Sequence, residues 1–334
     1  MKIRKKLLLL ILFVLLTGIV AAQDLPKITS RIGGTIQTWA SYGQINVSDT
    51  NSFGVGIKRA RLRAYSKYGN KVKGFIQVEV ASPRIIDARI EYLVSKSFSI
   101  RAGRFVGASV RAGALTSHTK LDITERSLSA IKFAKATVGG DFRDYGIDFV
   151  GKFGGLKANL TLHNGSGSLD IKSSQKASGA MNGGAAISGM LVYKPKAVKE
   201  LEIGGYYGKG NPQINDYEGQ NAFVYWSGKP IRIKMEYIAW KNRLNSNETN
   251  SRGYYIFAGY KIAKCLEAVA RFESFDPDID LEKNEQNLLT IGATYSIFPE
   301  KWNAAKITAA YMIKNESGVE LDNNVFQLAM QVVF

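Results

Sequence analysis

The last eleven residues of the chain, 324–334, constrain the fold most strongly because their apolar side chains alternate. Counted back from the C-terminus, every second position is apolar: Phe334, Val332, Met330, Leu328 and Phe326. The intervening positions are mostly small or polar. A period of two is that of a β-strand, and an apolar face opposite a mostly polar one suits a strand between lipid and a wet lumen. The alternative is an edge strand of a soluble β-sandwich.

The N-terminus has the pattern of a secretory signal peptide. Four basic residues precede an apolar run over 7–16, and small residues follow up to Ala22. The run is shorter than the ~20 residues that a membrane-spanning helix needs, and no later segment approaches that length. We therefore expect residues 1–22 to be removed on export. Residues 23–334 should then form one domain, either soluble or inserted in a membrane as strands.

The chain is strongly basic, with 45 Lys and Arg against 28 Asp and Glu. Such a balance fits nucleic acid, an anionic surface or anionic solutes. Export argues against intracellular nucleic acid, and the sequence contains no RNA-binding signature, so we expect no nucleic-acid partner. Cys265 is the only cysteine, which excludes an intrachain disulfide and a cysteine-based metal cluster.

Sixteen segments alternate in polarity and are separated by turn residues. Their centres lie near Ile36, Leu62, Val78, Ile90, Ile100, Phe149, Leu160, Leu191, Gly205, Val224, Met235, Phe257, Ala270, Ile291, Ala309 and Leu328. All seven prolines lie outside these centres, as expected because proline cannot donate to a strand ladder. The pattern predicts an all-β fold, a transmembrane antiparallel β-barrel of sixteen strands in contact with the lipid of a Gram-negative outer membrane.

The connections between these segments alternate between short and long. With both termini on the periplasmic side, short turns should follow even-numbered strands and longer loops should follow odd-numbered ones. The longer connections span 41–54, 106–143, 165–184, 209–220, 242–251, 276–286 and 315–323. Segment 106–143, the third loop, is too long for a hairpin connection, and such loops are usually functional or disordered. We interpret it as folded into the lumen, where it narrows the pore; an exposed extracellular loop is the alternative.

Aromatic residues near the expected strand ends fit the girdles that barrels place at the two membrane interfaces. They are Trp39, Tyr193, Trp226, Tyr237, Trp240 and Trp302. Each of them individually is also compatible with ordinary packing.

Basic residues alternate with apolar ones along 55–65, which places Arg59, Arg61 and Arg63 on one face. A Lys or Arg facing lipid costs roughly 2–4 kcal/mol at the membrane midplane, so three would cost on the order of 6–12 kcal/mol. We therefore expect these residues to face the lumen, and the same argument turns Arg89 and Arg101 inward. Arginine stays charged and presents several donors, which suits anions with several oxygens.

The third loop adds further basic residues to this set. The residues expected to line the pore and bind anions are Arg59, Arg61, Arg63, Arg89, Arg101, Arg111, Lys120 and Arg126. The alternative is that the arginines pair with lumenal carboxylates such as Glu79, Asp87 and Glu236 and only stiffen the wall.

Several short motifs, taken in order, resemble those of the phosphate-selective porin O and P family. They are Lys58-Arg-Ala-Arg-Leu62, Asp87-Ala-Arg-Ile-Glu-Tyr92, Arg101-Ala-Gly-Arg-Phe105, Thr124-Glu-Arg-Ser-Leu128 and Arg143-Asp-Tyr-Gly-Ile147, followed by Leu191-Val-Tyr-Lys-Pro195 and Ala270-Arg-Phe-Glu-Ser-Phe-Asp276. The terminal aromatic also resembles the C-terminal signature that the outer-membrane assembly machinery reads. Together the motifs span nearly the whole mature chain.

The resemblance implies a trimeric porin of sixteen strands, in which the third loop forms the constriction and basic residues guide anions such as phosphate or polyphosphate. By motif position Arg59 and Arg61 correspond to pore-lining basic residues, and Glu125-Arg126 corresponds to part of the third loop. Lys58 stands where an arginine is common. The resemblance therefore predicts anion preference without specifying phosphate.

Two other functions are compatible with a barrel. A structural or adhesive barrel with a plugged lumen would have the same strands but no conductance. An outer-membrane hydrolase would need a Ser/His pair with an orienting group, and neither of the two histidines, His118 and His163, lies in a recognisable catalytic motif. We expect a passive channel with no catalytic residues, no cofactor and no metal.

Overall fold

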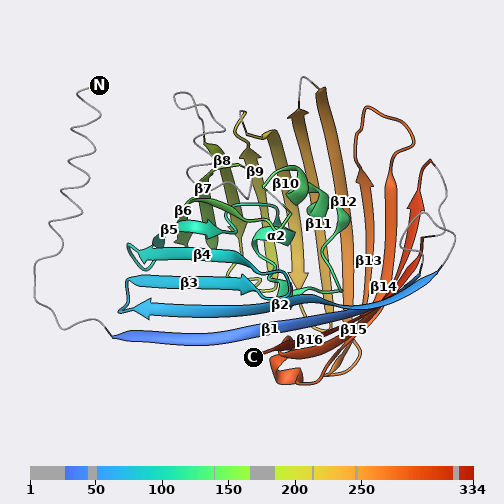
Figure 1. Cartoon of the computed structure of the whole chain (residues 1–334), viewed down its shortest axis with the longest axis horizontal. Coiled ribbons are helices and arrows are strands. Elements are labelled where there is room, and N and C mark those ends of the chain that lie inside the picture. Colours follow the sequence, from blue (N-terminus) through green and yellow to red (C-terminus); the bar gives the residue numbers. More distant parts are fainter. Residues whose placement is uncertain are drawn as a thin grey trace, which may run out of the picture.

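The computed structural model describes residues 27–43, 51–138, 140–165, 185–212, 214–244, 247–318 and 323–334. The predicted signal peptide, 1–22, lies outside these residues. Sixteen antiparallel strands close into one barrel, in which β1 pairs with both β2 and β16 (Figure 1). Among the described residues, no helix is long and apolar enough to cross a membrane.

The strands follow one another round the barrel in chain order. Their bounds are β1 Ile28–Gly43, β2 Ser52–Tyr68, β3 Val72–Glu79, β4 Arg84–Leu93, β5 Phe98–Phe105, β6 Asp144–Phe153, β7 Leu156–His163, β8 Ala186–Tyr193, β9 Leu201–Lys209, β10 Asp216–Ser227, β11 Ile231–Leu244, β12 Asn247–Lys261, β13 Leu266–Asp276, β14 Gln286–Ser296, β15 Ala305–Glu316 and β16 Val325–Val333. Every predicted strand centre lies inside one of these strands. The predicted sixteen-stranded barrel is confirmed.

The strands differ in length round the barrel. Strands β3 to β9 contain 8–10 residues, whereas β10 to β12 contain 12–15 and β1 and β2 contain 16 and 17. The expected loop over 242–251 is wrong, because β11 runs to Leu244 and β12 begins at Asn247. The two strands continue their pairing into this segment, with Arg243 opposite Glu248.

A β-bulge in β2 brings an additional lysine to the inner wall. The pairing of β1 with β2 shifts so that Gln37 faces Arg59 while Thr38 faces Ile57, which leaves Lys58 as the extra residue. Strict alternation would have turned Lys58 outward, but a bulge rotates the local side chains. Its Nζ instead lies 3.6 Å from Glu125 Oε2 in the third loop.

The aromatic girdle prediction is wrong for three of its six residues. Tyr193, Trp226 and Tyr237 are 39–45% exposed on the outer wall. Trp240 is buried inside the barrel, where its ring stacks on Phe275 at 5.7 Å between centroids. Trp39 lies beneath Lys58 on the inner wall, and Trp302 lines an internal cavity. The sequence alternation near these three positions did not reveal which face each residue occupies.

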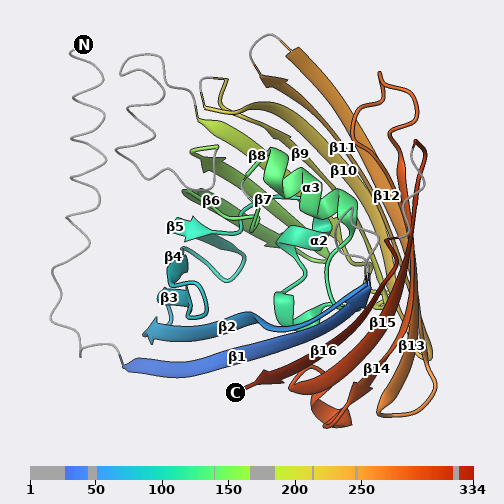
Figure 2. The same ribbon diagram turned by 45° about the vertical axis from the view of Figure 1, so that its right-hand side comes forward.

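Segment 106–143 contains α2 (Arg111–Ala114), the short 3₁₀ helix η1 (His118–Lys120) and α3 (Leu128–Ala136). Both α-helices lie within the outline of the barrel (Figure 2), and α3 packs against β11, β12 and β13. Phe133 of α3 is fully buried and contacts the rings of Tyr206 and Trp240 edge-on at 5.7 Å. Apolar contacts of this kind hold the segment against one side of the barrel.

Candidate functional site

Segment 106–143 lies between two internal cavities. The first, of about 820 Å³, lies between the segment and strands β2 to β5. The second, of about 880 Å³, lies between the segment and the β10–β11, β12–β13 and β14–β15 turns. Leu115 and Thr116 line both cavities, so this part of the segment forms the partition between them.

The wall of the first cavity carries more positive than negative charge. Its basic residues are Lys58, Arg59, Arg61, Arg63, Arg84, Arg89, Arg101, Arg126, Lys135 and Arg143. Its acidic residues are Glu79, Asp87, Glu125 and Asp141. A concave surface with one dominant sign of charge raises the local concentration of ions of the opposite sign. The first cavity can therefore concentrate anions.

Arg59 and Arg61 project from β2 toward the third loop and are both held in ion pairs. Arg59 Nη2 lies 2.6 Å from Glu125 Oε2, and Arg61 Nε lies 2.9 Å from Glu79 Oε2. Gln37 on the neighbouring strand also accepts a hydrogen bond from Arg59 Nη1 at 2.9 Å. Both guanidinium groups are thus fixed on the wall of the first cavity, each by an ion pair with one carboxylate.

Arg63 and Arg89 differ from this pair because no carboxylate of the described residues forms an ion pair with either of them. Arg63 donates to the carbonyl oxygen of Gly34 at 2.8 Å and to Thr35 Oγ1. Arg89 lies over the ring of Phe75 at 4.8 Å. An aromatic face orients a guanidinium without neutralising it. These two arginines therefore supply positive charge that a solute can reach.

His118 in η1 fixes the position of Arg61. Its Nδ1 lies 3.1 Å from Arg61 Nη1, and its carbonyl oxygen accepts a hydrogen bond from Gln37 Nε2 at 2.9 Å. Burial and the charges of Arg61 and Arg59 lower the pKa of His118 far below its ordinary value. The imidazole is therefore neutral, and its Nδ1 accepts a hydrogen bond from Arg61 Nη1. No local sequence pattern predicts this contact, because His118 and Arg61 are 57 residues apart in the chain.

Arg126 fixes the shape of the third loop from within. It donates to the carbonyl oxygens of Ala112 at 2.8 Å and Thr116 at 2.6 Å. Burial lowers its pKa to about 10, which still leaves the guanidinium charged at neutral pH. Arg101 pairs with Asp148 on the barrel wall. Arg126 and Arg101 thus line the first cavity with part of their charge compensated.

The structure divides the eight predicted anion-binding residues between the two cavities. Arg59, Arg61, Arg63, Arg89, Arg101 and Arg126 line the first. Arg111 and Lys120 line the second, and Arg111 pairs with Glu202 on β9. Four basic residues of the first cavity were not predicted as site residues: Lys58, Arg84, Lys135 and Arg143. Lys58 faces the cavity only because of the β-bulge. The other three residues lie in connections or next to one, where the alternation of polarity does not predict which side chains face inward.

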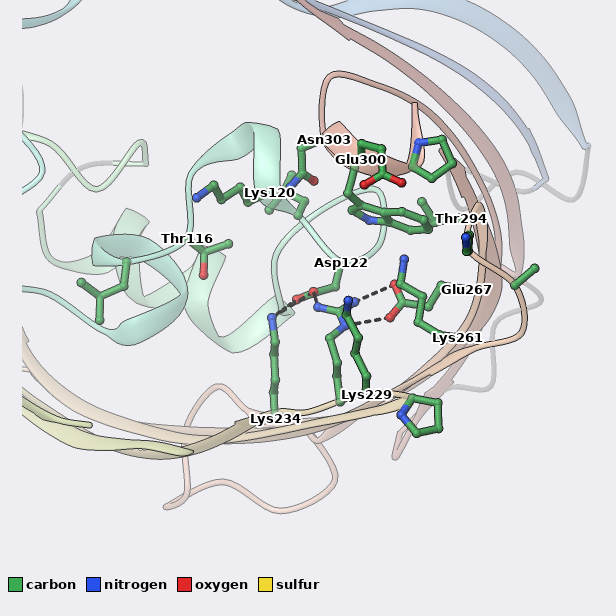
Figure 3. Close-up of a pocket in the computed structure, with 18 of the residues that line it drawn as sticks. Thr116, Lys120, Asp122, Lys229, Lys234, Lys261, Glu267, Thr294, Glu300 and Asn303 are labelled. Carbon is green, nitrogen blue, oxygen red and sulfur yellow. Dashed lines mark hydrogen bonds and ion pairs between the residues drawn. The ribbon is translucent and has the colours of Figure 1, made fainter. Parts of the chain in front are cut away.

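A four-residue ion-pair cluster anchors the third loop at the second cavity (Figure 3). Asp122 lies 2.7 Å from Arg232 Nη1 and 2.8 Å from Lys234 Nζ, both on β11. Arg232 also pairs with Glu267 on β13 at 2.7 Å. Burial alone would raise the pKa of Asp122, but the charges of Lys234 and Arg232 outweigh it and lower this pKa from 3.8 to about 2.

We expect this cluster to make the free energy of unfolding depend on pH between about pH 4 and 2. The folded-state pKa of Asp122 lies below its unfolded value, so its contribution is fully present above about pH 4 and is lost as pH falls toward 2. Asp122→Asn should therefore flatten the fall in free energy of unfolding between pH 4 and 2, as measured by urea unfolding across this range. Glu300→Gln, which removes an exposed carboxylate of the same cavity, is the control. Identical slopes for wild type and Asp122→Asn would contradict the prediction.

Two glutamates on the barrel wall accept hydrogen bonds from the backbone at the starts of α2 and α3. Both carboxylate oxygens of Glu236 accept from Ala112 N–H, at 3.1 and 3.2 Å, and Glu236 is only 2% exposed. Glu273 accepts from Leu128 N–H at 2.5 Å. The first N–H groups of a helix have no partner inside the helix, so the wall satisfies them. Each helix start is thereby fixed to a strand.

His163 is hydrogen-bonded to an aspartate on one side and a serine on the other, in the order found in a serine hydrolase triad. The three residues are buried where β6, β7 and β8 lie side by side. Its Nδ1 lies 2.7 Å from Asp144 Oδ2 and its Nε2 lies 2.8 Å from Ser188 Oγ. Ser188 is only 1% exposed, and among the described residues the cavity beside His163 is about 10 Å³. Ser188 is therefore buried among the strands in the described part of the chain. The network therefore links three strands.

The fold is shared with several solved outer-membrane channels. An anion-selective porin from Comamonas acidovorans aligns with a TM-score of 0.72 and 14% identity over 92% of this chain and 100% of the porin. The outer membrane channel DcaP of Acinetobacter baumannii aligns with a TM-score of 0.62 and 13% identity over 94% and 100%. OmpF of Salmonella typhi, in complex with daunomycin, aligns with a TM-score of 0.64 and 11% identity over 91% of this chain and 97% of OmpF.

No protein-family model matches the sequence, and no curated protein matches it. The barrel fold is nevertheless shared with these outer-membrane channels over nearly the whole chain. These comparisons support a porin fold, but they do not show the phosphate-selective porin O and P family that the sequence motifs resemble. Identities of 11–14% define a common architecture and carry no residue-level correspondence.

Proposed function

We propose that this protein is an outer-membrane porin that forms a passive diffusion channel with a preference for anions. The observation that carries the proposal is the wall of the first cavity, where ten basic residues face four acidic ones. Rings or columns of charged side chains set the ionic preference of a pore. The anion selectivity of the Comamonas porin, which shares the fold, is consistent with the same property here.

In this proposal anions move along the first cavity in three steps. Arg84 and Lys135, near the end of the barrel that carries the longer loops, attract them. Arg59 and Arg61 then stand opposite the third loop, which narrows the passage. Arg63 and Arg89 lie beyond this point on β2 and β4. Fixed cations lower the electrostatic barrier for an anion without requiring a chemical step, a metal or a cofactor.

The proposal includes three further properties of the mature protein. Residues 1–22 act as a signal peptide, the barrel is inserted in the outer membrane with both termini in the periplasm, and three copies assemble into a homotrimer. Phosphate and polyphosphate are candidate solutes of this channel, because they are among the anions conducted by the family that the sequence motifs resemble. Guanidinium groups with free donors, as in Arg63 and Arg89, suit the several oxygens of phosphate.

Planar-bilayer recording of the purified full-length protein tests the proposal. We expect stepwise conductance and a zero-current potential of the sign that anion permeation gives in a potassium chloride gradient. Added phosphate should reduce the chloride current at concentrations below those of chloride if phosphate is preferred. A cation-selective potential would overturn the proposal. Absence of conductance would favour the structural or adhesive barrel with a plugged lumen instead.

A further inference from the structure

A row of four side chains crosses strands β1 to β4, which lie side by side (Figure 1). Arg31 on β1 lies opposite Tyr65 on β2, and Tyr65 lies opposite Phe75 on β3. Phe75 in turn lies opposite Arg89 on β4. The alternation along β2 places Tyr65 on the same inner face as Arg61. We call these four residues of the row the aromatic–arginine stack.

The side chains of the stack follow one another without a gap. The Arg31 guanidinium lies 4.8 Å from the centre of the Tyr65 ring, and the Arg89 guanidinium lies 4.8 Å from the centre of the Phe75 ring. The centres of the two rings are 4.6 Å apart. These distances match the spacing of about 4.7–4.9 Å between neighbouring strands. Each side chain therefore lies against the next, with one guanidinium at each end of a pair of rings.

The stack contains two cations and no anion. Within the part of the chain that the structure describes, no carboxylate forms an ion pair with either arginine. Asp87 and Glu91 flank Arg89 on the inner face of β4, but both have other partners. Asp87 pairs with Arg143 at 3.0 Å, and Glu91 pairs with Lys73 at 3.6 Å. An aromatic face attracts a guanidinium without neutralising it, so both arginines of the stack keep their full charge.

The stack lies between the first cavity and the turn end of the barrel. A third cavity, of about 350 Å³, is lined by all four of its residues. Tyr65, Phe75 and Arg89 also line the first cavity. Because β2 ends at Tyr68 and β3 begins at Val72, the two rings lie close to the β2–β3 turn. A solute that leaves the first cavity on this side therefore passes the stack.

Ordinary apolar packing does not account for the two rings. The inner wall of a barrel around a wet lumen is mainly polar. Tyr65 and Phe75 are only partly buried, so both rings remain in contact with the lumen. An aliphatic side chain would bury a similar apolar area at either position but would offer a guanidinium no π-face. The position of the rings between two arginines is what requires an explanation.

We propose that the aromatic–arginine stack is a second selectivity-determining element of the channel, in which Tyr65 and Phe75 are positioning residues. The inference rests on the proposed anion channel and extends it to Arg31 and to two residues without charge. Asp87 and Glu91 each lie two residues, or about 7 Å, from Arg89 along the strand. Without the ring beside it, the Arg89 guanidinium can turn toward either carboxylate, and its effect on passing anions is then partly cancelled.

Planar-bilayer recording of the full-length protein in a potassium chloride gradient tests this inference. The test variant carries Tyr65→Leu and Phe75→Leu, which remove both rings and change no charge. Each ring contact favours the observed position of its arginine by about two- to fivefold, so the anion-to-cation permeability ratio should fall by about twofold or more. The control carries Tyr65→Phe and Phe75→Tyr, which keep both rings, and it should retain the wild-type ratio.

Removal of the two charges shows whether the rings act through them. Arg31→Gln with Arg89→Gln should lower the permeability ratio at least as far as the leucine variant does. Adding the two leucine changes to that background should have no further effect, because the rings then have no cation to hold. A further fall of the same size would overturn the inference, since the rings would then act through the shape of the pore.

The same recordings separate this inference from the proposed function. A wild-type ratio retained by the leucine variant of an anion-preferring channel would refute the inference and leave the proposed function intact. A wild type that prefers cations or does not conduct would refute the proposed function and the inference with it. If the double leucine change prevents insertion of the barrel, Phe75→Leu alone carries the test. It should lower the ratio by a smaller factor, whereas Phe75→Tyr should not lower it.

Discussion

Arg59→Glu combined with Arg61→Glu should abolish the anion preference of the pore and reverse it at low salt. The double change removes two positive charges and adds two negative ones. It also breaks the ion pair of Glu79 with Arg61 and leaves Glu125 with only its more distant cations, Lys58 and Arg126. Two unit charges ~4 Å apart interact by about 1–4 kcal/mol for an effective dielectric of 80 to 20. The anion-to-cation permeability ratio should therefore fall by about tenfold or more.

The measurement is the zero-current potential across a salt gradient. The effect should shrink when both solutions approach molar salt, because the Debye length then falls to about 3 Å. Lys71→Glu with Lys199→Glu changes the net charge equally at exposed turns outside the cavities and should leave the potential unchanged. A wild-type potential retained by the Arg59 and Arg61 variant would show that these residues do not control permeation.

Glu236→Ala should loosen the third loop and destabilise the barrel. The carboxylate accepts hydrogen bonds from Ala112 N–H, from Asn221 Nδ2 at 2.8 Å and from Tyr255 at 2.9 Å. Each buried donor left without an acceptor costs about 1–3 kcal/mol, so the free energy of unfolding should fall by roughly 3 kcal/mol or more. Release of α2 from the wall should also raise single-channel conductance and its current noise.

Urea unfolding and single-channel recording together check this expectation. Glu236→Gln keeps an oxygen that can accept from Ala112 N–H, so it should lose less than half of the stability that Glu236→Ala loses. Loss of stability with unchanged conductance and noise would mean that α2 remains in place without Glu236. Equal behaviour of the two variants would mean that the Ala112 hydrogen bond is not what anchors the helix.

The sequence predicted the barrel because each strand obeys the same local rule. In the proposed membrane setting, outward side chains meet lipid and inward ones meet water or the third loop, so a period of two appears in all sixteen segments. The terminal strand shows it most clearly, since Phe326 and Val332 are exposed while Gln327 and Gln331 are buried. This rule concerns only neighbouring positions along each strand, so the sequence alone shows the alternation.

The contacts of the third loop could not be predicted in the same way. Glu236 lies 124 residues beyond Ala112 and Glu273 lies 145 residues beyond Leu128, and no local pattern joins them. Lys58 turned inward because of a bulge that depends on the partner strand β1. The interfacial position predicted for Trp240 is wrong because this ring is covered by Phe133, which the third loop brings to it. These features arise from tertiary packing.

The unequal height of the barrel wall affects the surrounding bilayer. A strand of eight residues is about 27 Å long, and a tilt of about 40° reduces its span to about 21 Å, below the apolar band of about 25 Å that such barrels present. Strands β3, β5, β7 and β8 have eight residues and β9 has nine, so in the proposed membrane setting a solitary barrel would force the lipid beside them to thin. Association of copies through this low side would relieve that elastic deformation. Membrane thickness would then act on assembly as well as on insertion.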